Sequence, residues 1–342
     1  MAINCARFEY HDRIQWGVVR GPAAGGGAAG PLALGSLHAT QSETFLGQRI
    51  HPIDGEFATT GEFVQRVTAS TAASAAGDGV ELAAVKLLSP VTRNQRFICQ
   101  GANYRQHMIE SGVDPDAKTY NMIFTKAPSC IVPAAHDVLK PREVQFLDYE
   151  IELGLVIKCE IAARVDVSDA NLHEFIAGAV IVNDYSARDI QIPQMQFYKG
   201  KSFRTFGPVG PYLCLLESKD MSVLKDLRLR LTVNGEVRQS DSTRNLVYGP
   251  AETLTELSGV HDLYPGDLLA TGTPAGCALS IPSPAVQRIG ALLPERMRWN
   301  AFMRVQARQS GYLKPGDVVE ASIKSDDGTI DLGLQRNRIV RA

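Results

Sequence analysis

Residues 148–157 read Asp148-Tyr149-Glu150-Ile151-Glu152-Leu153-Gly154-Leu155-Val156-Ile157, so an acidic cluster leads directly into an apolar run. Side chains alternate between the faces of a β-strand, which places the acidic residues on one face and Ile151, Leu153 and Leu155 on the other. Two carboxylates about 4 Å apart repel by about 4 kcal/mol at an effective dielectric constant of ~20. Solvent, basic side chains, raised pKa values or a divalent cation can offset this repulsion. Because Mg²⁺ and Ca²⁺ prefer oxygen ligands, the cluster indicates a metal site.

A second acidic segment follows another apolar run. Val180-Ile181-Val182 is typical of a buried strand, and it ends at Asn183-Asp184. A carboxylate at the end of a core strand points into a pocket more often than into open water. Glu150, Glu152 and Asp184 would then form an oxygen-rich site with positions left for water and substrate, as Mg²⁺ is often held. Taken alone, the first cluster is also compatible with a solvated strand face whose carboxylates stand apart.

The composition excludes several classes of protein. The chain has 342 residues, 44% of them hydrophobic, and a net charge of −2 without long runs of one sign. This balance argues against nucleic acid or an anionic membrane as the main partner. The six cysteines are scattered without C-x-x-C spacing, which favours reduced thiols. Without a signal-peptide pattern or an apolar stretch of about 20 residues, we expect a cytoplasmic protein.

Patterning divides the chain into a small N-terminal α+β lobe, residues 1–94, and a strand-rich catalytic domain, residues 95–342. Helices are predicted at Thr60–Ala73, Asn103–Gly112 and Pro294–Arg308, and Ser168 is predicted to N-cap another helix. The 294–308 helix is amphipathic, which is typical of a helix that covers the core or a subunit interface. Strands are predicted at Ile3–Phe8, Ile14–Val19, Ile151–Ile157, Ala177–Val182, Gly210–Leu216, Leu227–Val233, Asp267–Ala270, Val318–Ile323 and Ile330–Leu334.

Two further segments can carry chemistry. His107 and Glu110 are three residues apart and share one face of the predicted helix. A carboxylate beside an imidazole raises its basicity and fixes its tautomer, as general-base catalysis requires. Lys201, between Gly200 and Ser202, can reach an anion. Each feature alone is also compatible with a surface pair or a solvated lysine.

The features above, each weak alone, belong to a series of seven motifs that follow one another in a fixed order. They are Asn103–Glu110 (Asn-Tyr-x-x-His-x-x-Glu), Phe124–Ser129 (Phe-x-Lys-x-Pro-Ser), Asp148–Leu153 (Asp-Tyr-Glu-x-Glu-Leu), Asn183–Gln191 (Asn-Asp-x-x-x-Arg-Asp-x-Gln), Gly200–Phe203 (Gly-Lys-Ser-Phe), Gly207–Pro211 (Gly-Pro-x-Gly-Pro) and Thr271–Gly276 (Thr-Gly-Thr-Pro-x-Gly). In this order they resemble the fumarylacetoacetate hydrolase family, over nearly all of residues 97–340.

The resemblance implies a β-rich α+β fold, a mixed β-sandwich roll, with a divalent metal and commonly a homodimer. The metal is usually Mg²⁺, with Mn²⁺ or Ca²⁺ as alternatives. By position in the motifs, the implied metal ligands are Glu150, Glu152 and Asp184, and Asp148 takes a supporting or pairing role. The implied catalytic residues are the water-activating dyad His107 and Glu110, with Lys201. The implied substrate contacts are Arg188, Gln191 and Thr273, whereas Lys126 is not expected to act directly.

We therefore expect a hydrolase that cleaves a carbon–carbon bond in an acylpyruvate or related 2-oxo or 1,3-diketo acid, in catabolism of aromatic or similar compounds, through a metal-held enolate. Relatives with the same residues also isomerise, hydrate or decarboxylate 2-oxo acids, so these reactions remain alternatives. A binding protein stabilised by a cation, without turnover, is the alternative of another class. The stretch Cys277–Tyr312 is longer than in compact members of the family, which predicts a differently walled pocket.

Overall fold

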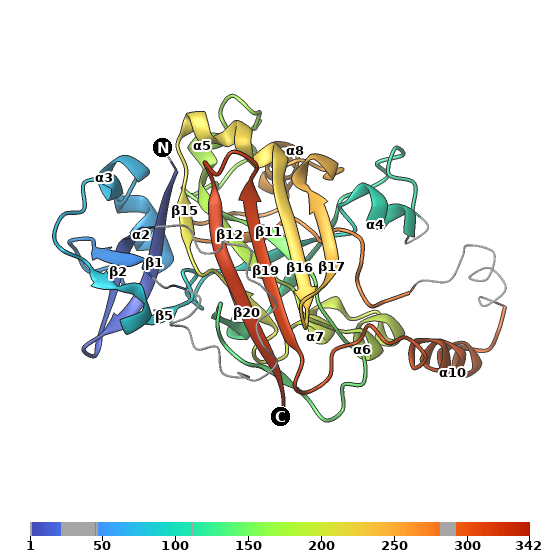
Figure 1. The fold of residues 1–342 in the computed structure, drawn as a ribbon. Helices are drawn as coiled ribbons and strands as arrows, with labels where there is room; N and C mark the ends of the chain where they lie inside the picture. Colours follow the sequence, from blue (N-terminus) through green and yellow to red (C-terminus); the bar gives the residue numbers. More distant parts are fainter. Residues whose placement is uncertain (1, 22–44, 46, 111–112, 281–291) are drawn as a thin grey trace.

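The acidic cluster and the second apolar run lie on the two central strands of the fold. The computed structural model describes residues 2–21, 45, 47–110, 113–280 and 292–342. It is β-rich with a few short helices, as predicted (Figure 1). The strands are β1 Ile3–Tyr10, β2 Arg13–Arg20, β3 Arg49–Pro52, β4 Val80–Glu81, β5 Lys86–Leu88, β6 Phe97–Gly101, β7 Met122–Lys126, β8 Ile131–Pro133, β9 Val138–Lys140, β10 Leu147–Asp148, β11 Ile151–Ile157, β12 Ile176–Asn183, β13 Ser186–Ala187, β14 Gly207–Val209, β15 Leu213–Leu215, β16 Leu227–Val233, β17 Glu236–Ser242, β18 Leu268–Ala270, β19 Val318–Ser325 and β20 Asp331–Arg341.

The helices are short, and most lie at the edges of the sheets. The α-helices are α2 Thr60–Arg66, α3 Ala69–Ala73, α4 Arg105–Glu110, α5 Leu172–Phe175, α6 Arg188–Gln194, α7 Phe197–Lys201, α8 Pro250–Ser258 and α10 Glu295–Gln306. The 3₁₀ helices are η1 Leu82–Ala84, η2 Pro128–Cys130, η3 Ser218–Asp226 and η4 Thr243–Asn245. None of the helices in the described ranges is long and apolar enough to cross a membrane.

Two sheets pack face to face around the main core. The larger follows the order β4-β3-β2-β1-β15-β12-β11-β18-β6-β7, and the smaller the order β17-β16-β19-β20-β9. Figure 1 shows β16, β19 and β20 lying over β11 and β12. Leu153 and Leu155 of β11 point into the core between the sheets, together with Leu229 and Leu231 of β16. Val156 points to the opposite face, where it belongs to a second core, so the predicted alternation is confirmed for the apolar residues of β11. The expectation that all three acidic residues share one strand is wrong, because Asp148 lies on β10 and Glu150 between β10 and β11.

The N-terminal strands continue the larger sheet. β1 pairs antiparallel with β15, and β2 and β3 follow outward from it. Trp16 of β2 stacks on Phe63 of α2 with ring centroids 3.9 Å apart, which fixes the helix against the sheet. The lobe therefore shares a sheet with the rest of the chain, and the domain boundary at residue 94 stays a prediction.

Three predicted helices differ from the observed ones. The 60–73 helix is broken into α2 and α3 because Thr68 accepts from the backbone N–H of Thr71 and starts a new helix there. Ser168 is not an N-cap, because its hydroxyl donates to Asn171, the residue that precedes α5. The Asn103–Gly112 helix is observed as α4, and its last two predicted residues lie outside the described ranges.

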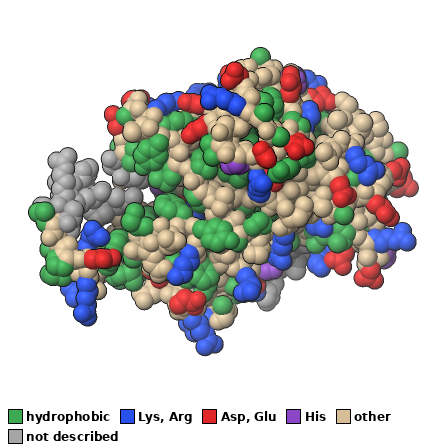
Figure 2. Space-filling view, turned by 180° about the vertical axis from the view of Figure 1, so that it is seen from behind, with side chains coloured by type: hydrophobic (Ala, Val, Ile, Leu, Met, Phe, Trp, Pro, Cys, Tyr) green, Lys and Arg blue, Asp and Glu red, His purple; other side chains and the backbone are tan. Residues whose placement is uncertain are grey.

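The 294–308 helix is observed as α10, which extends away from the body of the molecule (Figure 1). Only Gln306 among its residues is buried, so most of the helix does not cover the core. The alternative, a subunit interface, stays a prediction, as does the homodimer. On the face seen from behind, acidic and basic side chains are interspersed, in keeping with the net charge of −2 (Figure 2).

Candidate active site

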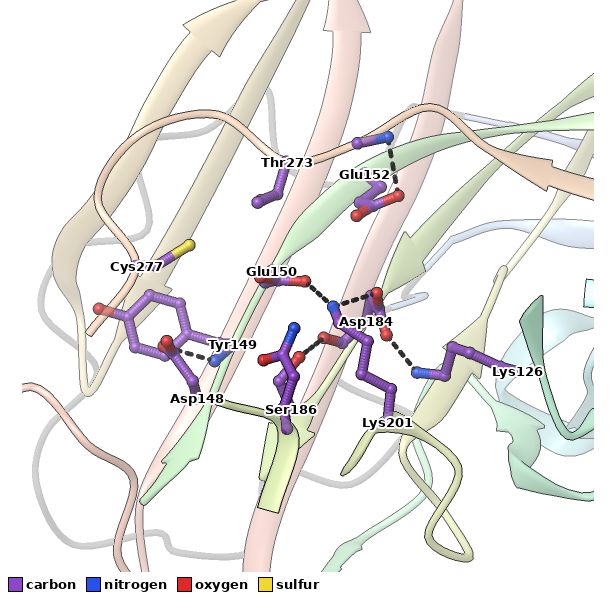
Figure 3. Close-up of polar contacts among 12 residues, drawn as sticks. Lys126, Asp148, Tyr149, Glu150, Glu152, Asp184, Ser186, Lys201, Thr273 and Cys277 are labelled. Carbon is purple, nitrogen blue, oxygen red and sulfur yellow. Dashed lines mark hydrogen bonds and ion pairs between the residues drawn. The ribbon is translucent and has the colours of Figure 1, made fainter. Parts of the chain in front are cut away.

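Three carboxylates meet where β11 begins and β12 ends (Figure 3). Ile151 pairs with Asn183 in the antiparallel ladder, which brings Glu150, Glu152 and Asp184 to the same end of the two strands. One oxygen of each carboxylate lies within 4.8 Å of the other two, and all three residues are buried. The fold therefore assembles the acidic triad that the sequence predicts.

Two buried lysines lie against Asp184. Lys201 Nζ donates to Asp184 Oδ2 at 2.5 Å and also to Glu150 Oε2. Lys126 Nζ donates to Asp184 Oδ1 and, at 2.7 Å, to the carbonyl of Phe206. Burial opposes the charged form of Lys201, but the charges of Asp184 and Glu150 outweigh it and raise its pKa. Lys201 therefore stays an ammonium ion, which can stabilise negative charge but does not act as a base.

Arg188 connects the triad to two further buried side chains. Its Nη2 donates to Glu150 Oε1 at 2.5 Å, its Nε to Asp148 Oδ2 at 2.8 Å and its Nη1 to Gln191 Oε1 at 2.8 Å. Burial disfavours the charged form of Glu150, but Arg188 and Lys201 prevail and lower its pKa to about 2. Asp148 lies on β10 and pairs with Arg188, so its supporting role is consistent with the structure.

Glu152 is the carboxylate that lacks a basic partner among the described residues. Its Oε2 accepts from the backbone N–H of Gly272 at 2.9 Å. Gly272 has φ +93°, and a Cβ there would approach the Asn103 side chain to 2.8 Å, so glycine is required. Burial, followed by the charges of Asp184 and Glu150, raises the pKa of Glu152 well above its usual value.

This donor set fits a divalent cation. The triad offers only carboxylate oxygens, the ligands that Mg²⁺, Mn²⁺ and Ca²⁺ accept. Negative charge at Glu152 is left unbalanced by the neighbouring lysines, and a cation would balance it. Glu150, Glu152 and Asp184 are therefore able to hold a divalent metal.

Thr273 is buried beside the triad, but its hydroxyl is used within the protein. Its Oγ1 donates to the carbonyl of Ile151 at 3.0 Å and accepts from Gln239 Nε2 at 2.8 Å. Gln239 Oε1 in turn accepts from the Ile151 N–H at 3.0 Å. These bonds fix the loop after β18 against the start of β11, so the predicted substrate contact of Thr273 stays a prediction.

His107 and Glu110 line a cavity of about 330 Å³, and the charge of Glu150 acts on two of its lining residues, His107 and Cys277. Its other lining residues are Cys277, Ala278, Leu279, Ser280 and Gln309. Glu110 is exposed and accepts from Gln106 Nε2 at 3.2 Å, and no bond joins it to His107 among the described side chains. Burial lowers the pKa of His107, although Glu150 acts in the opposite direction. The imidazole is therefore mostly neutral near pH 7, and the dyad stays a prediction.

Two residues matter more than the sequence suggested. Lys126 is completely buried and is one of the cations of the cluster, although no direct role was expected for it. Gln239 was not predicted at all, because it lies on β17, 88 residues from its partner Ile151, in a segment without a distinctive pattern. The Phe-x-Lys-x-Pro motif was the only available signal for Lys126.

Comparisons with known proteins confirm the family that the sequence motifs resemble. A sequence model of a protein family, described as "Fumarylacetoacetate (FAA) hydrolase C-terminal", matches residues 96–340. Oxaloacetate tautomerase YisK of Bacillus subtilis is 38% identical over 212 residues, 61% of this chain and 68% of that protein. A mitochondrial oxaloacetate tautomerase of Bos taurus is 38% identical over 194 residues, 56% of this chain and 60% of that protein.

Solved structures with the same fold cover nearly the whole chain. A fumarylacetoacetate hydrolase from Exiguobacterium antarcticum has a TM-score of 0.66 at 27% identity, covering 99% of this chain and 100% of that one. A probable 2-hydroxyhepta-2,4-diene-1,7-dioate isomerase from Mycobacterium abscessus has a TM-score of 0.70 at 25% identity, covering 100% and 99%.

Proposed function

The chain belongs to the fumarylacetoacetate hydrolase family, and from that premise we propose that it interconverts the keto and enol forms of a 2-oxo dicarboxylic acid of the oxaloacetate type. The relatives named oxaloacetate tautomerase, at 38% identity, support this reaction class ahead of the carbon–carbon hydrolysis expected from the sequence. Glu150, Glu152 and Asp184 would hold the cation, for which we propose Mg²⁺.

The chemistry of the cation is simple. When bound, it would supply a Lewis acid that polarises the carbonyl of a 2-oxo acid. Lys201 adds a fixed positive charge against two of the three ligands, and this charge would stabilise the negative charge that develops as a proton leaves the substrate carbon. Arg188 holds Glu150 and Gln191 in place and adds a second cation on the other side.

His107 is the proposed proton carrier. Because burial lowers its pKa, a ring nitrogen is free to accept a proton from the substrate carbon near pH 7. The same nitrogen can return that proton to oxygen, or the reverse, so the cycle needs no activated water. We do not assign this task to Lys201, because its Nζ already donates to Glu150 and Asp184.

The observation that carries the proposal is the arrangement of His107 without its predicted carboxylate partner. Hydrolysis requires a base oriented to deprotonate water, and Glu110 would supply that orientation. In the structure Glu110 accepts from Gln106 instead. A single neutral imidazole beside an acidic triad suits a proton shift better than water attack.

Carbon–carbon hydrolysis is the second candidate. It is favoured by one observation, that His107 and Glu110 line the same cavity, so a rotation of Glu110 could place it against the imidazole. Its substrate would be an acylpyruvate or related diketo acid, as in catabolism of aromatic compounds.

One product-resolved assay separates these candidates. The protein is incubated with Mg²⁺ and either enol-oxaloacetate or an acylpyruvate, and enol absorbance and released pyruvate are followed. The proposal predicts accelerated loss of the enol form without pyruvate, abolished by EDTA. Pyruvate release from the acylpyruvate would establish the hydrolase instead. If EDTA lowers the melting temperature but neither substrate changes, the protein is the cation-stabilised binding protein.

A further inference from the structure

We propose that Asp148 is a positioning residue that fastens one wall of the active-site cavity to the Arg188–Glu150 pair. The cavity wall is defined here as residues 277–280, which line the cavity together with His107 and Glu110. The inference rests on the proposed function, because it assigns the wall and the ion pair to one substrate site.

Asp148 uses both carboxylate oxygens and is completely buried. Oδ1 accepts from the backbone N–H groups of Tyr149 at 2.9 Å and Ala278 at 2.8 Å. Oδ2 accepts from the backbone N–H of Leu279 at 3.0 Å and from Arg188 Nε at 2.8 Å. One buried anion therefore joins the arginine to the cavity wall.

The two wall bonds come from consecutive residues. Successive backbone N–H groups that point at one anion form a concave binding site for it, and bonds to a charged acceptor are about twice as strong as neutral ones. Ala278 and Leu279 bind Asp148 in this way. Gly276, just before the wall, is held as well, since Tyr149 Oη donates to its carbonyl at 3.1 Å.

The other end of the wall has a separate fastening. Gln306, buried at the end of α10, donates to the Ser280 carbonyl at 2.7 Å and accepts from Tyr312 Oη at 2.6 Å. Tyr312 stacks on Phe146, with ring centroids 4.9 Å apart. The long segment between the Thr-Gly-Thr-Pro motif and β19 thus returns to the strand that carries Asp148.

This arrangement gives Asp148 and Gln306 different duties. Loss of Asp148 frees the wall and also removes one of the two carboxylates that hold Arg188. Loss of Gln306 frees the wall at Ser280 and leaves the Tyr312 hydroxyl without this acceptor, but it does not touch Arg188. Because residues 277–280 supply four of the seven residues that line the cavity, we expect their position to affect which 2-oxo acids fit there.

Amide hydrogen exchange tests the fastening without any substrate. In Asp148→Asn, the side-chain NH₂ of the asparagine cannot accept a hydrogen bond from a backbone N–H. The peptide covering residues 277–280 should therefore exchange about tenfold faster, the effect expected from losing one charge-assisted hydrogen bond. Gln306→Leu should accelerate the same peptide while leaving residues 186–191 unchanged. Asp189→Asn is the matched control, because Asp189 accepts from the Gln145 N–H at 2.8 Å and does not touch the wall.

Kinetics with two substrates test the consequence. The ratio of KM for a longer 2-oxo acid to KM for oxaloacetate should shift by about tenfold in Asp148→Asn, which loses a charge-assisted hydrogen bond. It should shift by less in Gln306→Leu, which loses neutral bonds, and stay unchanged in Asp189→Asn. Wild-type exchange rates in the 277–280 peptide, or equal acceleration in Asp189→Asn, would overturn the role of Asp148. If Asp148→Asn does not fold, the wild type decides: backbone N–H groups of Ala278 and Leu279 that exchange as fast as unprotected ones would overturn the role of Asp148. Failure to turn over either substrate would refute the proposed function. The exchange result would still show whether Asp148 holds residues 277–280 in place.

Discussion

Replacing Glu152 by glutamine should stabilise the metal-free protein and weaken metal binding at the same time. Glu152 is buried among Glu150 and Asp184 without a basic partner in the described part of the chain. At the observed limit of 4.8 Å and an effective dielectric constant of ~20, each like-charge pair costs about 3.5 kcal/mol. Glutamine removes this charge and keeps an oxygen for the N–H of Gly272.

The gain in free energy of unfolding has an upper limit. Glu152 can avoid the repulsion by taking up a proton. At a pH about three units above its ordinary pKa this protonation costs about 4 kcal/mol, so the gain from glutamine does not exceed that amount. We therefore expect Glu152→Gln to gain about 2 kcal/mol in EDTA, which raises Tm by about 4 °C. Mg²⁺ should raise the Tm of the wild type and have little effect on the variant, because one of three ligands is gone.

The assay is thermal unfolding followed by circular dichroism near neutral pH, in EDTA and across a Mg²⁺ titration. Glu236→Gln is the matched control, since Glu236 is an exposed glutamate whose one ion pair among the described residues is with Arg238 at the surface. A Tm for Glu152→Gln several degrees below the wild type in EDTA would refute the repulsion argument. An unchanged Mg²⁺ midpoint would show that Glu152 is not a ligand.

Three further predictions concern the groups around the triad. Lys201→Met should destabilise the protein in EDTA by about 3–5 kcal/mol in chemical denaturation, because it leaves Glu150 and Asp184 without a shared cation, and Mg²⁺ should recover part of this loss. An unchanged denaturation midpoint would contradict the buried ion pairs. His107→Ala should lower kcat by about 10²–10⁴-fold while calorimetry shows metal binding retained, and near-normal turnover would remove His107 from the mechanism. The pKa of His107 lies below 6.5 and its neutral form is the active one, so kcat should be constant between pH 7 and 8 and fall as pH drops through that lowered pKa; a rate that rises on acidification would refute its role as a base.

The central strands could be predicted because their patterns are local. β11 has the predicted bounds, and β12 differs by one residue at each end, because an apolar run bounded by polar residues needs no distant information. The prediction of one helix over 60–73 was wrong, because Thr68 caps a new helix and so interrupts the apolar periodicity. α10 was found, but its position outside the core depends on what the rest of the chain leaves uncovered, which periodicity does not contain.

The site was predictable as a set of residue types and less so as a network. Alternation along β11 and the end of β12 pointed to the three carboxylates, and the ordered motifs selected them over Asp148. The contacts of Lys126 with Asp184, Gln239 with Ile151 and Asp148 with Leu279 join residues 58, 88 and 131 positions apart, so no local pattern reports them. Both Gln106 and His107 are close enough along the helix to pair with Glu110, and their spacing in the sequence does not show that Gln106 is the partner.

The central claim is that this site moves a proton between carbon and oxygen of a 2-oxo acid. Incorporation of solvent deuterium at C3 of oxaloacetate, followed by NMR with catalytic amounts of Mg²⁺-loaded protein, measures that step directly. We predict incorporation well above the uncatalysed rate, without carbon–carbon cleavage, lost on addition of EDTA and in His107→Ala. Incorporation at the uncatalysed rate, or a rate that EDTA does not change, would contradict the claim.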